Sequence, residues 1–171
     1  MAHDWGLAVV RGVTGGLMVG HGAQKLFGVF EGPGLQGTGA FMESLGLKPG
    51  HIWGTTAALS EFGGGALTAL GLFHPLGPIG TISAMSMAWG KAHAGKPIWA
   101  TSGGAELPLT NIGVAVGLLL AGPGDISLDN ALGSELPRPL AVLALVGAAA
   151  AVAYGLMQPP APQSAGQAAS D

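Results

Sequence analysis

Residues 5–27 read WGLAVVRGVTGGLMVGHGAQKLF, and this stretch decides the class of fold. At about 1.5 Å of rise per residue, a helix of this length crosses a hydrocarbon core of about 30 Å with some tilt. Gly12, Gly16 and Gly20 recur every four residues, a ridge that favours close packing by a neighbouring helix. Residues 1–4 lack a basic segment, so we interpret the stretch as a retained span, not a signal peptide.

The composition of the whole chain supports a membrane protein. Of 171 residues, 49% are hydrophobic and only 9% are charged, whereas soluble domains carry about 25% charged residues. The absence of cysteine excludes disulfides, thiolate zinc sites and iron–sulfur ligation. A net charge of -3 without a basic cluster gives no indication of nucleic-acid binding.

Four further apolar stretches follow the first, so residues 1–157 are predicted to form one all-α integral membrane bundle. The expected spans are residues 5–27, 52–73, 76–91, 107–121 and 140–157. The third and fourth are shorter than the usual ~20 residues, and those two alone are compatible with a soluble bundle. Residues 158–171 are rich in Pro, Ala, Gln and Ser, and we expect a disordered tail.

Two loops carry signals for short helices. Thr38 is expected to cap a helix that places Phe41, Met42 and Leu45 on one face, acting either as a lid or as a lipid anchor. Ser127 is expected to cap a turn farther along the chain.

Alternation of the spans distributes the polar residues unequally between the two membrane sides. We call the side at the start of the first span side A; side B then holds loops 28–50 and 92–106 and the tail. Arg11 alone enters from side A, whereas seven polar groups gather toward side B: His21, Gln24, Lys25, Glu61, Lys91, His93 and Glu106. The lysines favour a cytoplasmic side B, but Lys25 and Lys91 belong to this group themselves, so orientation stays open.

Glu61 is the most informative member of this group. It lies about 14 Å from the side-B end of its span, where an unpaired charge is costly, so it is expected to pair or to be protonated. His21 and Lys25, four residues apart on one helix face, are the candidate partners. A plainer interpretation also stands, in which His21 only joins two helices and the terminal lysines and Glu106 extend to the interface.

Several motifs together resemble the DoxX family, over about residues 7–132. They are HGAQKLFG at 21–28, GPGL at 32–35, FMESLG at 41–46, EFGG at 61–64, ELPL at 106–109 and GPGDISLD at 122–129. The resemblance implies a four-helix membrane protein of bacteria or archaea. The family name comes from association with the DoxD and DoxA subunits of a thiosulfate:quinone oxidoreductase. Residues 140–157 lie beyond that pattern and predict a fifth, C-terminal transmembrane helix.

The resulting hypothesis is a multi-pass subunit of a larger redox complex in a prokaryotic cell membrane. His21, Lys25 and Glu61 are the expected proton donors. Gln24, Phe41, Lys91, His93 and Glu106 are the expected quinone pocket, and no metal site is expected. The alternatives are a stand-alone quinone-linked oxidoreductase subunit and, less favoured, a small-solute or proton pathway. Expected partners are the lipid bilayer, other membrane or membrane-associated redox subunits and, in a homo-oligomer, further copies of this chain.

Overall fold

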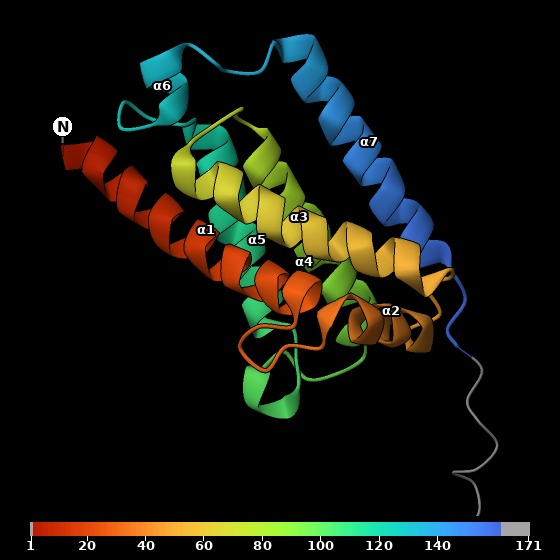
Figure 1. Cartoon of the computed structure of the whole chain (residues 1–171). Coiled ribbons are helices and arrows are strands. Elements are labelled where there is room, and N and C mark those ends of the chain that lie inside the picture. Colours follow the sequence, from red (N-terminus) through yellow and green to blue (C-terminus); the bar gives the residue numbers. More distant parts are fainter. Residues whose placement is uncertain (1, 162–171) are drawn as a thin grey trace, which may run out of the picture.

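The computed structural model describes residues 2–161, with the side chains of residues 2 and 3 left aside. Over this part the chain is entirely helical, with seven α-helices, one short 3-10 helix and no strand (Figure 1). This confirms the all-α prediction. The elements are α1 (Ala2–Phe27), α2 (Gly34–Ser44), α3 (Gly50–Leu70), α4 (Leu76–Ala92), η1 (Ala100–Ser102), α5 (Glu106–Ala121), α6 (Leu128–Leu132) and α7 (Arg138–Met157).

The five predicted spans correspond to α1, α3, α4, α5 and α7, with small shifts at their ends. The largest shift at a C-terminus is in α3, which ends at Leu70 where residue 73 was expected. Gly71 takes a left-handed conformation there, with φ of 61°, and its N–H and that of Leu72 bond to carbonyls of the last turn. This glycine closes the helix because it adopts positive φ without steric cost.

The helices pack in the order α1, α3, α4, α5, with α2 across the first half of α3 and α7 on the outside of α4. Figure 1 shows α1 and α3 side by side, and α7 diverging from the bundle toward its own N-terminal end. The loops also gather as the alternation predicted. The Leu136 N–H bonds to the His74 carbonyl on side A, and Lys91 bonds to the Gln158 carbonyl on side B.

Two glycines set the close approach of α1 to α3. A Cβ at Gly22 would lie 2.3 Å from the Phe62 nitrogen, and one at Gly15 would lie 2.5 Å from the Ala69 nitrogen. Around Gly12, Gly16 and Gly20, by contrast, no such atom lies within 4 Å. The predicted ridge therefore does not pack inside the described part of this chain. Spacing of four residues fixes a shared face, but it does not determine which face is buried.

The outer surface of the bundle is apolar. Leu17, Leu120 and Leu143 expose 62%, 82% and 67% of their surface, as suits side chains in contact with lipid. By length and apolar composition, α7 is the one described helix that qualifies to cross a membrane by itself, and α5 is apolar but shorter.

The short helices confirm one predicted cap and correct another. The Ser127 hydroxyl accepts from the Asn130 N–H at the start of α6, as expected. Thr38 does not cap α2, because the helix already begins at Gly34 and Thr38 is buried in its middle. There it packs where Gly39 meets α3; a Cβ at Gly54 would lie 2.9 Å from the Gly39 nitrogen. The tail predicted at residues 158–171 falls mostly outside the described residues, which end at residue 161.

Candidate functional site

A cavity of about 910 Å³ lies between α1, α2, α3, α4, α5 and α7. Its wall is mostly apolar and includes four methionines, Met18, Met42, Met85 and Met87. Thioether side chains are flexible and adapt to irregular ligands. Phe41, Met42 and Leu45 of α2 all line it, which confirms the prediction that they share a face. The volume falls within the range of small-molecule sites, about 300–1,000 Å³.

An ion pair between Lys25 and Glu61 lies at the wall of this cavity. The Lys25 ammonium, in the last turn of α1, donates to Oε2 of Glu61, in the middle of α3. The Glu61 side chain is 6% exposed and that of Lys25 is 25% exposed. The predicted pairing of Glu61 is confirmed, with Lys25 as the partner. Because Lys25 is the more open of the two, it has donor capacity left for a bound molecule.

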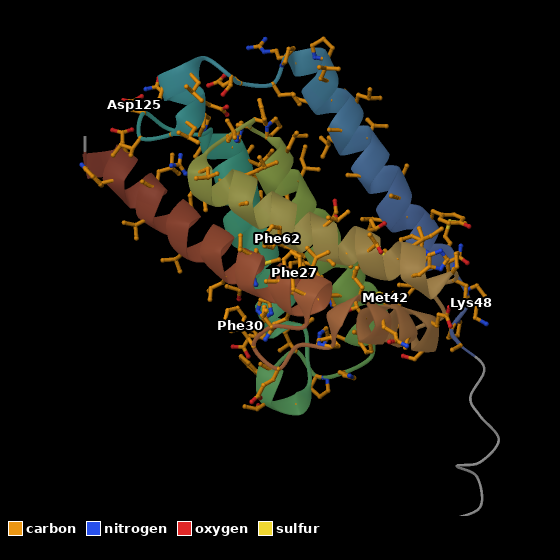
Figure 2. The ribbon with its side chains drawn as sticks, viewed as in Figure 1. Phe27, Phe30, Met42, Lys48, Phe62 and Asp125 are labelled. Carbon is orange, nitrogen blue, oxygen red and sulfur yellow. The ribbon has the colours of Figure 1, made fainter. Side chains whose placement is uncertain are left out.

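Packing next to the pair holds α1 and α3 in register. Gly22 lies directly against Phe62, the residue after Glu61, and the Phe27 ring meets the Phe62 ring edge to face. Their centroids are 5.6 Å apart at an interplanar angle of 88°, and Figure 2 shows the two rings where α1 crosses α3. The position of Lys25 relative to Glu61 thus follows from a backbone contact that tolerates no side chain at residue 22.

Four of the other predicted site residues line the same cavity: His21, Phe41, Lys91 and His93. The Lys91 ammonium donates to the Gln158 carbonyl at 2.6 Å, and His93 Nδ1 lies 2.7 Å from the Gly103 carbonyl. The remaining two lie outside its wall. Gln24 donates to the Phe30 carbonyl at 3.3 Å, and a Glu106 oxygen accepts from the Ala100 N–H at 2.8 Å, so both tie loops together.

Sequence reasoning missed several polar groups of the cavity wall, namely Thr56, Ser60, Ser83, Lys96 and Asn111. Thr56 and Ser60 are four residues apart and precede Glu61 on α3, a pattern of small polar residues inside an apolar helix that could have identified them. The described residues hold no group of three His, Asp or Glu side chains placed for a metal ion.

A second polar cluster, also missed, lies at the side-A end. Nη2 of the buried Arg11 donates to the Ile126 carbonyl. Asp129, 1% exposed, accepts from the N–H groups of Phe73 and His74 at 2.8 and 2.7 Å and from the Ser134 hydroxyl at 2.8 Å. Burial lowers the pKa of His74, which lies in the same turn. The sequence signal was Asp129 itself, in the first turn of a helix capped by Ser127.

Comparison with known proteins identifies the family of this chain. The DoxX family model matches residues 6–94, just over half of the chain. The protein therefore belongs to the DoxX family, a family of membrane proteins, and is in contact with the lipid bilayer. The match covers α1 to α4, including Lys25 and Glu61, and leaves α5, α6 and α7 outside. Neither curated proteins nor solved structures give a match.

Proposed function

We propose that this protein is a multi-pass subunit of a redox complex in a prokaryotic cell membrane and that its cavity binds a quinone. In this proposal α1, α3, α4 and α5 form the four-helix core and α7 is a fifth span. The lipid-exposed apolar surface supports that topology. Electrons come from a partner subunit, and this chain supplies the binding site and the protons.

The observation that carries the proposal is the Lys25–Glu61 pair at the wall of a large apolar cavity. A quinone combines a flat apolar ring with carbonyl oxygens that accept hydrogen bonds. The Lys25 ammonium suits such an oxygen, because its positive charge also stabilises the negative charge that develops on reduction. The apolar wall accommodates the ring.

Reduction of a quinone to a quinol takes up two electrons and two protons, one proton on each oxygen. His21 and the Lys25–Glu61 pair are the proposed proton donors of the site, because imidazole, ammonium and carboxyl groups can serve as general acids. Lys91 and His93 line the same cavity and supply further donors for the second carbonyl. Phe41 and Met42 of α2 cover the site as a lid.

Titration of the purified protein with ubiquinone and menaquinone analogues tests this proposal. Trp53 lines the cavity, so quenching of tryptophan fluorescence reports binding. We expect saturable binding that weakens about tenfold or more in Glu61→Gln and His21→Ala, since each removes a polar contact worth on the order of 1.4 kcal/mol or more. Glu31→Gln, an exposed glutamate at the same end, is the matched control. A titration that does not saturate, or the same affinity in all variants, contradicts quinone binding at this site.

The subunit role has its own support in the exposed ridge of Gly12, Gly16 and Gly20 on α1. Small residues permit close packing by another helix, and none of the described helices of this chain takes that place. Purification from native membranes in a mild detergent should retain a redox partner, and Gly16→Leu should release it. Recovery of the chain alone, together with thiosulfate-dependent quinone reduction by it, would favour the stand-alone oxidoreductase.

A further inference from the structure

The inner face of α7 is built from small residues. Along this helix Ala141, Ala144, Ala148 and Val152 are half-buried, and the larger Leu143 and Val146 point outward, exposed by 67% and 59%. Gly155 is the one fully buried residue of the helix. A face of small side chains ordinarily lets two helices approach closely. Here most of that face borders the cavity instead, with Ala144, Ala148, Ala151 and Val152 in its wall.

Small residues of other helices also line the cavity. They are Ala84 and Ala88, one turn apart on α4, and Ala57 on α3. We call Ala57, Ala84, Ala88, Ala144 and Ala148 the alanine wall. On α7 the cavity wall as a whole extends about 12 Å, from Ala144 to Val152. The alanine wall is smooth and carries no hydrogen-bonding side chain, so it suits an aliphatic chain and not a polar ligand.

The C-terminal end of α7 is fixed to the bundle. The Trp53 and Tyr154 rings stack with centroids 6.1 Å apart, and Lys91 donates to the Gln158 carbonyl just after the helix. A Cβ at Gly155 would lie 2.8 Å from the Trp53 ring. Toward its N-terminal end α7 diverges from α3 and α4 (Figure 1). The alanine wall thus adjoins a helix that is fixed to the bundle at its C-terminal end and stands away from α3 and α4 toward its N-terminal end.

We propose that the alanine wall holds the isoprenoid tail of the quinone and that the molecule enters sideways from the bilayer between α7 and α4. This inference rests on the proposed function, because the ring of the same molecule is placed at Lys25 and Glu61. Three observations select this occupant. The alanine wall belongs to the same cavity as the ion pair, it is apolar, and α7 beside it exposes an outer face of large apolar side chains that suits lipid, where quinone tails reside.

The experiment compares two probes, a ubiquinone with a short isoprenoid tail and the corresponding tail-less benzoquinone, on three forms of the full chain. Ala148→Phe fills the space beside the alanine wall, and Ala149→Phe places the same ring on the exposed side of α7. We expect Ala148→Phe to weaken the tailed probe about tenfold, the equivalent of roughly two buried methylene groups, and to leave the tail-less probe unchanged. Ala149→Phe should bind both probes as the wild type does.

The outcomes separate the two proposals. If the wild type binds neither probe, quinone binding itself fails. If it binds both and Ala148→Phe weakens both equally or neither, only the tail path is overturned. A quinone with a photoreactive group at the end of its tail gives a second measurement that needs no variant. Labelling of peptides from α7 and α4 supports the path, and labelling confined to α2 or to the loops overturns it.

Discussion

The two ends of this bundle bury similar ionic groups and use them differently. At side A, Arg11 borders a space of only about 10 Å³, and the buried Asp129 carboxylate accepts hydrogen bonds from two main-chain N–H groups and a serine hydroxyl. At side B, Lys25 and Glu61 adjoin a cavity of about 910 Å³. Figure 2 shows how far Asp125, in the loop before α6, lies from Phe27 and Phe62 beside the ion pair.

This difference shows how a buried charge that only stabilises the fold can be distinguished from one that can contact a ligand. A buried carboxylate is stable when hydrogen bonds occupy its oxygens, and Asp129 achieves this with the backbone of the turn between α3 and α4. Its three hydrogen bonds and its near-complete burial keep a ligand away from it. The Lys25–Glu61 pair satisfies the charge requirement with a single contact and leaves donor and acceptor positions facing open space. Four predictions follow this contrast.

Asp129→Ala should have the largest effect, a loss of about 3–5 kcal/mol of stability, because it leaves two backbone N–H groups without their acceptor and removes the negative charge near the buried Arg11. Thermal melting in detergent, followed by circular dichroism, measures it. Asp125→Ala, an exposed aspartate in the loop before α6, should melt like the wild type. Equal melting of the two variants would mean that side A is not held by this carboxylate.

Gly22→Ala should cost about 3 kcal/mol, since its methyl group would collide with the Phe62 backbone. Gly20→Ala is the matched control, because its methyl group meets no atom and alanine is the better helix former. The same melting assay applies, together with quinone titration. Gly22→Ala should lose both stability and binding if α1–α3 contact sets the position of Lys25, and a normal result for both would refute that.

Lys25→Met should cost about 2 kcal/mol, because it leaves a buried carboxyl without its partner. The cost is smaller than at Asp129, since Glu61 borders the cavity whereas Asp129 is enclosed by protein. The double variant Lys25→Met/Glu61→Gln should recover most of this loss, and Lys48→Met, on the loop between α2 and α3, should change nothing. Additive losses in the double variant would show that the two side chains act independently.

The pH dependence at side A should be the smallest effect. Burial places the pKa of His74 below its ordinary value of 6.5, so the unfolded chain binds this proton more readily than the folded one. Stability should therefore fall as the pH drops below about 6.5 and level off below the folded-state pKa, with a slope of at most about 1.4 kcal/mol per pH unit. Melting of the wild type and of His74→Gln across this range measures it; an identical slope in both excludes His74 as the source.

Prediction from sequence succeeded for features that follow from a strong local pattern or from the free-energy cost of burying a charge. The apolar stretches located α1, α3, α4, α5 and α7, and the cost of burying Glu61 predicted its pairing before any contact was known. Thr38 was assigned the wrong place because α2 begins without a side-chain cap. Gln24 and Glu106 were grouped with the cavity because depth along a helix axis says nothing about direction around it.

The sequence by itself determined that the chain is helical, that it resides in a membrane, and that most of its few polar groups gather toward one end. Hydropathy and the energetic cost of an unpaired charge are local properties, so they can be read from the order of residues. Only the tertiary structure decided that Gly22 and not Gly20 meets α3, that Lys25 and not His21 holds Glu61, and that the inner face of α7 borders a cavity. These outcomes depend on the rotation of each helix about its axis, which is set by contacts between residues far apart in the chain.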